Sequence, residues 1–243
     1  MSQNIVVLTG SGISAEAGIP TFRSSDGLWE NHRIEEVATP EAFYRNPNLV
    51  HQFYNLRRQK LKDPLVQPTL AHLALAELEK QWTSSFSLIT QNVDDLHERA
   101  GSKNLIHMHG ELQKALCSFC KSRFEWLNDL SRRDVCRNCG FSGRLRPDIV
   151  WFGESPYHLS EIDDALDGCD IFISIGTSGK VYPAAGFAEL ANAKRKIEIN
   201  IAESDISNRF NEHRIGLASI EVPLLVRKLF EESENLTNSG LPL

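Results

Sequence analysis

Several features are missing from this 243-residue sequence, and each absence excludes a class of protein. No apolar run approaches the roughly 20 residues that span a bilayer, so we expect no membrane-spanning helix and no membrane partner. The 26 basic residues are outnumbered by 32 acidic ones, so the basic surface of a nucleic-acid binder is absent. Residues 1–4 lack the charged and apolar regions of a signal peptide. We therefore expect a cytoplasmic protein that binds no nucleic acid.

The composition and the apolar runs indicate a globular α/β protein. Apolar residues make up 41% and charged residues 24% of the sequence, as is typical of a chain with a packed core. Apolar runs that predict buried strands lie at 5–8, 86–90, 105–108, 148–152, 171–175 and 197–201. Segments with helical periodicity lie between most of them, at 70–82, 159–166 and 183–193. This alternation predicts a Rossmann-like parallel sheet with helices on both faces.

Two stretches interrupt the alternation and predict a smaller lobe. Residues 27–68 contain no predicted strand but have a helical pattern at 48–62, and residues 113–146 are polar and cysteine-rich. We expect a helical insert and a cysteine-rich insert, respectively. The core that contains the parallel sheet would then comprise 1–26, 69–112 and 147–230. Residues 231–243 are polar, and we expect a flexible tail.

The glycine-rich segment at 10–15, Gly-Ser-Gly-Ile-Ser-Ala, follows the first predicted strand. Small residues at this spacing let the backbone approach a dinucleotide pyrophosphate. Gly18 and Pro20 end the following helix almost at once, and Phe22 and Arg23 lie in the loop beyond. This pattern favours a dinucleotide that is consumed as well as bound, although an isolated motif of this kind also occurs in plain turns.

Four of the five cysteines form two pairs, Cys117-x-x-Cys120 and Cys136-x-x-Cys139, with fifteen residues between the pairs. This is the spacing of a zinc ribbon, in which four thiolates surround one Zn²⁺ tetrahedrally. A closed site of four cysteines leaves no position for a substrate, so we expect a structural metal. Cys169 precedes an apolar strand and is expected to be an inert buried thiol.

Polar residues follow the predicted strand at 86–90, where ligands bind in open α/β sheets. Gln91, Asn92 and Asp94 offer amide and carboxylate groups suited to ribose and carboxamide. The alternative is a cap for the next helix.

Two histidines end the strand at 105–108. His109 precedes Gly110, where the backbone can turn away and admit a ligand, and an imidazole can act as a general base near neutral pH. His107 is expected to be a structural residue behind the site.

Three further groups are weaker candidates. The loop at 176–179 and Asn200 could contact phosphate or ribose, although each also fits a plain turn. Tyr54 and Arg57 are three residues apart, so on a helix they share one face and could bind a carboxylate. An exposed helix face is the alternative.

The order of these motifs over about 5–230 resembles that of the sirtuins, NAD-dependent protein-lysine deacylases. The shared motifs are the glycine loop leading into Gly-Ile-Pro-x-Phe-Arg, then Thr-Gln-Asn-x-Asp-x-Leu-His, His-Gly and the paired Cys-x-x-Cys. Ser11 replaces the usual alanine and Ala17 a common serine, and both are small. Tyr54, Arg57 and Ala38 resemble the class III branch, which removes acidic acyl groups such as succinyl and malonyl.

The resemblance implies a mechanism and a set of site residues. The acyl oxygen of the lysine attacks C1′ of the nicotinamide ribose, and His109 acts as general base through the ribose hydroxyls. The products are free lysine, nicotinamide and O-acyl-ADP-ribose. The implied NAD-binding residues are Gly10, Ser11, Gly12, Ile19, Phe22, Arg23, Trp29, Gln91, Asn92, Val93, Asp94, Gly176, Thr177, Ser178, Asn200, Ile201, Ala202 and Ala218. The implied substrate-binding residues are Tyr54, Arg57, Ala38, Val150 and Phe152, the last two through β-augmentation.

Three other functions use the same motifs: a dehydrogenase, a non-catalytic NAD sensor that displays a zinc ribbon, and a protein ADP-ribosyltransferase. The dehydrogenase lacks a separate substrate domain, and the sensor would not need His109. We expect NAD and one structural Zn²⁺ as ligands, acyl-lysine proteins as substrates and a monomeric chain.

Overall fold

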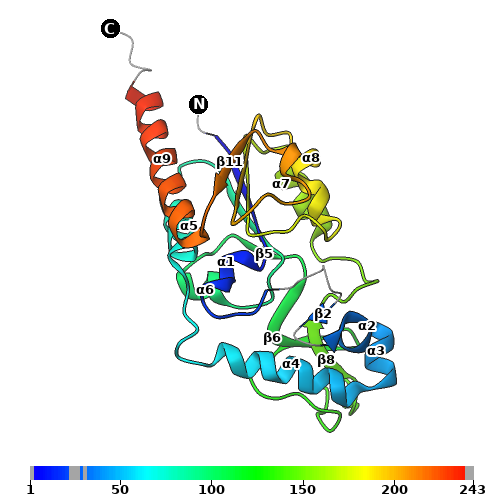
Figure 1. Ribbon diagram of the computed structural model, residues 1–243. Helices are drawn as coiled ribbons and strands as arrows, with labels where there is room; N and C mark the ends of the chain where they lie inside the picture. Colours follow the sequence, from blue (N-terminus) through cyan, green and yellow to red (C-terminus); the bar gives the residue numbers. More distant parts are fainter. Residues whose placement is uncertain (1–2, 22–27, 30–31, 239–243) are drawn as a thin grey trace.

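The computed structural model describes residues 3–21, 28–29 and 32–238, with the backbone alone at 28–29 and 236–238. Within this part, six strands form a parallel sheet in the order β11-β10-β9-β1-β4-β5 (Figure 1). They are β1 (Ile5–Thr9), β4 (Phe86–Thr90), β5 (Leu105–His107), β9 (Ile171–Ile175), β10 (Arg195–Asn200) and β11 (Glu212–Ile215). The antiparallel sheet β7-β6-β8 consists of β6 (Gly110–Cys117), β7 (Arg123–Glu125) and β8 (Leu145–Ile149).

Helices cover both faces of the parallel sheet because its strands are apolar on both sides. Along β1, Ile5 and Val7 belong to one core cluster, whereas Val6 and Leu8 belong to the other. The first face packs against helices α1 (Gly12–Ala15), α5 (Leu70–Gln81) and α9 (Ala218–Asn238). The second packs against α7 (Leu159–Asp167), η1 (Ala184–Gly186) and α8 (Phe187–Leu190), on the opposite side in Figure 1.

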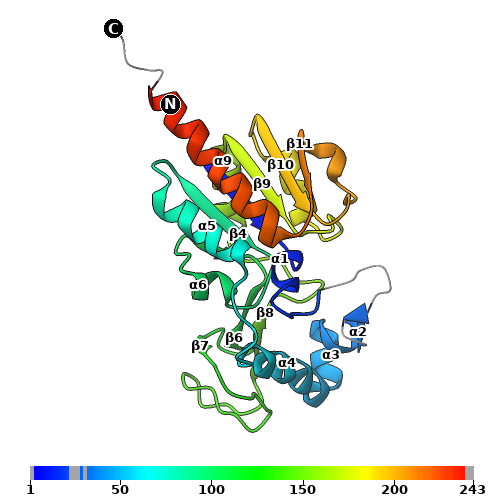
Figure 2. The same ribbon diagram turned by 60° about the vertical axis from the view of Figure 1, so that its left-hand side comes forward.

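The antiparallel sheet and a group of helices form the lower part of the molecule in Figure 2. The helices are α2 (Ile34–Val37), α3 (Pro40–Arg45) and α4 (Pro47–Leu61), which follow the hairpin of β2 (Leu28–Trp29) and β3 (His32–Arg33). Thr39 and Asn46 cap the amino ends of α3 and α4, and a proline follows each cap. This arrangement satisfies orphan amides and sets the first helical φ. Residues 96–100 form α6 (Leu96–Ala100), and Ser207–Arg209 form η2.

The predicted Rossmann-like sheet is confirmed, but one of its expected strands is wrong. The run at 148–152 was assigned to this sheet, whereas the strand is β8, antiparallel to β6 in the other sheet. A short apolar run predicts burial without identifying the partner strand. Pro147 lies within β8 and lacks an amide hydrogen, which suits the edge position that β8 occupies.

Three other expectations need correction. The insert at 27–68 contains the short strands β2 and β3 as well as helices. Strand β11 was not predicted, because its sequence is polar, as is typical of an edge strand, and contains no apolar run. Residues 231–238, expected to be a flexible tail, continue α9, where Glu232 bonds to Arg195 at 2.6 Å and lies 3.6 Å from Lys228. The division into a core and two inserts stays a prediction.

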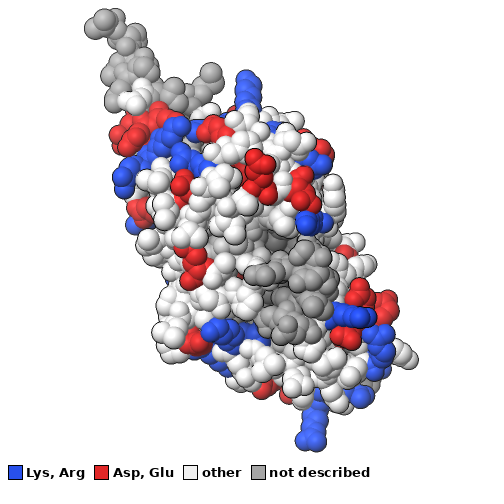
Figure 3. Space-filling view, viewed as in Figure 1, with Lys and Arg blue, Asp and Glu red and all other residues white. Residues whose placement is uncertain are grey.

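Acidic and basic side chains are interspersed over the face of the molecule in Figure 3. Among the described residues, we find no helix with the length and apolarity required to cross a membrane.

Gly110 gives a test of the junction between the two sheets. Its φ is +81°, and a Cβ there would lie 2.1 Å from the carbonyl oxygen of Asp148. We expect Gly110→Ala to lower the unfolding free energy by more than about 3 kcal/mol, because strain and overlap add. Gly18 is the control, with φ +80° and no described atom within 4 Å of the point where a Cβ would lie. Gly18→Ala should cost about 1 kcal/mol in urea unfolding. Equal costs for the two variants would contradict this packing.

Candidate functional site

Two glycine turns at the carboxyl ends of β1 and β9 close tightly on each other. The amide of Gly10 donates to the carbonyl of Ile175 at 2.9 Å, and the amide of Gly12 donates to that of Gly176 at 2.8 Å. A Cβ on Gly12 would lie 2.6 Å from the Cα of Gly176. Only glycine permits this approach, so both turns present their backbone to the space above the sheet.

The loop after β4 joins these turns through its amide side chains. Gln91 Nε2 donates to Thr177 Oγ1 at 3.2 Å. Asn92 Nδ2 donates to the carbonyl of Gly10 at 3.1 Å and lies 3.2 Å from Ser14 Oγ. Asn92 is 7% exposed, so its amide is held in one orientation between the loops.

Asp94 is a buried carboxyl group in the same loop. Ser14 Oγ donates to it at 3.0 Å and the amide of Leu96 at 3.2 Å. Burial raises the pKa of Asp94 to about 6, although both hydrogen bonds act in the opposite direction. Ser14 Oγ also lies 3.5 Å from His72 Nε2, so a polar chain extends from the loop into α5.

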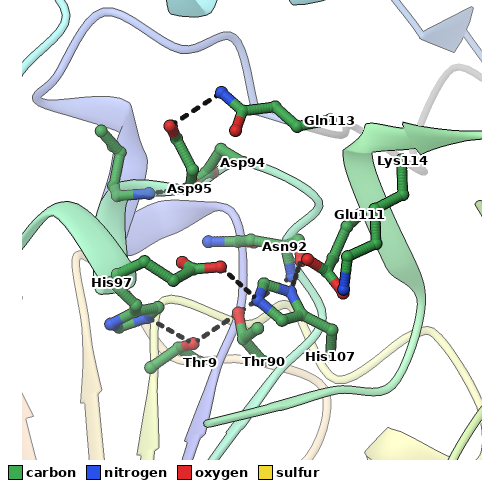
Figure 4. Close-up of polar contacts among 12 residues, drawn as sticks. Thr9, Thr90, Asn92, Asp94, Asp95, His97, His107, Glu111, Gln113 and Lys114 are labelled. Carbon is green, nitrogen blue, oxygen red and sulfur yellow. Dashed lines mark hydrogen bonds and ion pairs between the residues drawn. The ribbon is translucent and has the colours of Figure 1, made fainter. Parts of the chain in front are cut away.

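A second polar chain lies behind the loop (Figure 4). Thr9 Oγ1 donates to Thr90 Oγ1 at 2.9 Å and bonds to His97 Nε2 at 3.0 Å. Burial lowers the pKa of His97 well below its ordinary value, so the ring is neutral. This chain fixes the ends of β1 and β4 relative to α6.

His107 supports the loop from behind, as expected for a structural residue. Its Nε2 lies 2.8 Å from Glu98 Oε1 and its Nδ1 3.4 Å from the carbonyl of Asn92 (Figure 4). Burial alone would lower its pKa, but the hydrogen bond and charge of Glu98, with Glu111, raise it above the ordinary value. His107 is not among the described residues that line the cavity.

His109 faces the cavity with one nitrogen. Its Nδ1 lies 3.1 Å from the carbonyl oxygen of Gln91. Because a carbonyl only accepts, Nδ1 carries the proton and Nε2 keeps its lone pair. Burial lowers the pKa of the ring, and the Gln91 bond offsets part of this shift. The ring is therefore a neutral base at neutral pH.

One cavity of about 930 Å³ joins the two glycine turns, the loop after β4 and His109. Its walls come from the carboxyl edge of the parallel sheet, the end of β8 and the helices α2 and α4. The predicted site residues that line it are Gly10, Ser11, Gly12, Ile19, Ala38, Tyr54, Gln91, Asn92, Val93, Asp94, His109, Val150, Phe152, Gly176, Thr177, Ser178, Asn200, Ile201, Ala202 and Ala218.

Four predicted residues are not brought to the described lining. Phe22 and Arg23 lie outside the described residues, as does the side chain of Trp29. Arg57 is buried on α4 with its guanidinium 3.1 Å from the centre of the Phe53 ring, and it is not among the described lining residues.

The segment after β8 connects His109 with the helical insert. The amide of Val150 donates to the carbonyl of His109 at 2.8 Å, and that of Phe152 donates to the carbonyl of Ala38 at 3.0 Å. Between them, Trp151 Nε1 donates to Tyr54 Oη at 2.9 Å. His109, Tyr54 and Ala38 therefore lie along one wall of the cavity.

Sequence reasoning missed several lining residues. Ser14 stands inside the glycine motif, and Trp151 stands between two residues that were assigned, so a closer reading of those segments could have found both. Others lie in loops that carry no motif. They include Lys180, Tyr182, Glu203, Ser204, Asp205 and Leu217.

The four paired cysteines meet in the antiparallel part, as their spacing predicts. Their sulfur atoms all lie within 4.8 Å of one another. Cys117 Sγ is 3.8 Å from Cys139 Sγ, and Cys120 Sγ is 3.6 Å from Cys136 Sγ. Four sulfurs at about 2.3 Å from a zinc ion are spaced about 3.8 Å apart, so the cluster has the dimensions of such a site.

Comparison with known proteins agrees with this arrangement. The model of the Sir2 family matches residues 10–183. A protein of Bdellovibrio bacteriovorus named NAD-dependent protein deacylase is 60% identical over 94% of this chain and 97% of its own length. A solved Sir2 homolog–NAD complex is 40% identical, with a TM-score of 0.84 over 95% of this chain and 91% of that one. A solved Sir2 bound to an acetylated peptide is 28% identical, with a TM-score of 0.77 over 96% of this chain and 94% of that one. The resemblance to sirtuins is confirmed, and the chain belongs to the Sir2 family.

Proposed function

We propose that this protein removes acyl groups from lysine side chains of proteins and consumes NAD in the reaction. The observation that carries the proposal is the position of His109, whose Nε2 lone pair faces a cavity shared by the glycine turns and the segment after β8. Relatives named NAD-dependent protein deacylase support it. From the composition we also propose a cytoplasmic protein, and we propose that the chain is a monomer.

NAD fits the sheet side of the cavity. The closed glycine turns bring Ser11, Thr177 and Ser178 into the cavity wall, and the polar groups of these residues suit a pyrophosphate. The Asn92 amide and the Asp94 carboxyl suit the polar nicotinamide carboxamide, and Asn200 suits a ribose. NAD supplies an electrophilic C1′ carbon and a nicotinamide leaving group.

The chain's own contribution to the chemistry is one proton transfer. The neutral imidazole of His109 takes a proton at Nε2, while Nδ1–H stays bonded to the carbonyl of Gln91. That bond orients the ring and stabilises its positive charge once the proton has arrived. The proton comes from a ribose hydroxyl, which the transfer makes nucleophilic toward the acyl carbon.

The acyl-lysine peptide fits the wall formed by 150–152. Val150 and Phe152 line the cavity beside His109, which suits the addition of a peptide strand along this segment. A lysine of a peptide bound there would enter beside His109 and direct its acyl group toward Tyr54 and Ala38.

We further propose that acidic acyl groups, such as succinyl and malonyl, are preferred over acetyl. Tyr54 is a hydrogen-bond donor in the wall, and Ala38 is a small residue that leaves room for a longer chain. The charge of Arg57, one helical turn from Tyr54, is close enough to act on the Tyr54 hydroxyl. Buried positive charge favours a carboxylate over a methyl group.

We propose a structural zinc ion in the four-cysteine cluster. Zn²⁺ prefers four thiolates in this geometry, and Cys117 and Cys136 are buried against Leu130 and Leu145. The ion would hold the end of β6 and the loop after β7 together, and its role would be structural.

The function is tested by incubating the protein with NAD and acyl-lysine peptides and identifying both products by mass. We expect nicotinamide and O-acyl-ADP-ribose. His109→Ala should lower kcat/KM at least about 100-fold, because the general base is lost. The control His158→Ala alters an exposed histidine and should retain activity. Reduced nicotinamide, ADP-ribose attached to the peptide, or full turnover by His109→Ala would each refute the proposal.

The acyl preference is tested with Arg57→Met. Loss of the buried charge should reduce kcat/KM for a succinyl-lysine peptide by roughly 10- to 100-fold, the range for a hydrogen bond or ion pair to a charged group. Acetyl-lysine, and a neutral acyl chain of similar length, should change less than about threefold. Equal losses for acidic and neutral chains would mean that Arg57 does not recognise charge.

The metal is tested by Cys136→Ser. We expect this variant to lose its one zinc per chain and to melt roughly 10 °C lower, since structural zinc contributes folding free energy. Cys169→Ser is the matched control, because Cys169 is a buried thiol outside the cluster. A Cys136→Ser protein with unchanged zinc content, measured by elemental analysis, is the contrary result.

A further inference from the structure

The loops around the four-cysteine cluster carry three large apolar side chains that are more than half exposed. Phe119 is 60% exposed, and Val135 and Phe141 are each 52% exposed. The two phenyl rings meet edge to face with their centres 4.9 Å apart, and Val135 pairs with Ser142, the neighbour of Phe141. These loops form the lower end of the molecule in Figure 2. Apolar groups that stay exposed in one cluster are typical of a surface that binds a partner.

Four exposed basic side chains lie on the same loops. They are Lys121, Arg132, Arg133 and Arg144. Within the part of the chain that the structure describes, none of the four forms an ion pair. The nearest acidic residue in sequence, Asp134, instead accepts hydrogen bonds from the amide and the hydroxyl of Ser131. The four cations and the three apolar residues together are called the ribbon surface below.

Backbone contacts bring the parts of the ribbon surface together from separate segments. The amide of Ser118 donates to the carbonyl of Arg144 at 2.7 Å, which places the turn that contains Phe119 beside Arg144. A Cβ on Gly143 would lie 3.4 Å from the carbonyl oxygen of Arg132. Cationic and apolar groups are therefore neighbours at one end of the molecule.

The charge of this insert is opposite to that of the rest of the chain. Residues 113–146 contain eight Lys and Arg but three Asp and Glu, whereas the other residues contain 18 Lys and Arg and 29 Asp and Glu. A nucleic acid that extended beyond the insert would be repelled by the rest of the chain. A short acidic polypeptide would not, and guanidinium groups bind its carboxylates through paired hydrogen bonds. The charge distribution therefore favours an acidic polypeptide segment.

The ribbon surface adjoins the sheet that leads to the proposed peptide-binding segment. Cys117, at the end of β6, is opposite Leu145 of β8, and β8 then leads to Val150 at the cavity. Five residues of extended strand span about 17 Å. The residues that directly flank an acyl-lysine in the cavity are too close to it to reach the ribbon surface, whereas a segment farther along the same protein can.

We propose that the ribbon surface is a docking site for an acidic segment of the protein substrate, remote from its acyl-lysine. The inference rests on the proposed deacylase function and deepens its substrate class. Docking raises the effective concentration of the acyl-lysine at the cavity. It should therefore lower KM for substrates that carry such a segment, without changing kcat.

The test compares two acyl-lysine peptides with the same short sequence around the lysine. One continues through a Gly/Ser linker of about ten residues, whose mean span is about 17 Å, into a segment rich in Asp, Glu and Phe. We expect its KM to be about tenfold lower at low salt, because several exposed ion pairs each contribute weakly. The gain should shrink as salt is added, and a Lys-rich segment in place of the acidic one should give no gain.

Charge reversal assigns the gain to the ribbon surface. Arg133→Glu combined with Arg144→Glu should remove the gain and leave kcat/KM for the short peptide within about twofold. Lys194→Glu combined with Arg227→Glu is the matched control, since it changes the net charge equally at exposed positions before β10 and on α9. The control should keep the gain. If the Arg133→Glu and Arg144→Glu protein fails to fold, the salt dependence and the Lys-rich peptide decide with the unaltered protein.

The outcomes separate this inference from the function beneath it. Equal KM values for the two peptides, or a gain that survives reversal of Arg133 and Arg144, overturn the inference and leave deacylation intact. A single-stranded oligonucleotide that binds through the same two arginines, while the acidic segment changes nothing, overturns it in favour of nucleic acid. Unaltered protein with no NAD-dependent deacylation of the short peptide refutes the function itself.

Discussion

The position of the His109 imidazole depends on the backbone at Gly110. The chain leaves the parallel sheet after β5 and enters the antiparallel sheet at β6 within a few residues. Gly110 makes this exit in a left-handed conformation, with the Asp148 carbonyl where any side chain would lie. His109 is thereby held between the sheets: its carbonyl accepts from Val150 and its Nδ1 bonds to Gln91. The close approach of Gly110 to the Asp148 carbonyl therefore sets the position of the proposed base relative to the proposed peptide-binding segment.

Burial keeps three histidines at and behind the cavity neutral. It lowers the pKa of His72, His97 and His109 and is the largest cause in each case. Their rings bond to hydroxyl or carbonyl groups. Burial also raises the pKa of Asp94 to about 6, a value at which the carboxyl group is still mostly ionised at neutral pH. The imidazole of His109 is therefore uncharged and can accept a proton.

The sequence predicted most of the parallel sheet because its strands are continuous apolar runs separated by periodic helices. It could not identify the partner of the run at 148–152, since burial alone does not specify a sheet, and it missed β11, whose polar residues suit an edge. About half of the described cavity-lining residues were predicted, among them Asn92 and His109, where a strand end coincides with a motif. Trp151 lies between two predicted residues, but its long-range bond to Tyr54 is encoded by no local pattern.

The central claim is that His109 is a neutral base with its Nε2 lone pair directed into the cavity. Nitrogen-15 NMR of the ring across a pH titration tests it most directly, because chemical shifts report both the tautomer and the pKa. We predict the Nδ1–H tautomer at neutral pH and a pKa below the ordinary value of 6.5, with the ring protonating only as the pH falls through that lower pKa. An Nε2–H tautomer, or a ring already protonated at neutral pH, would contradict the account.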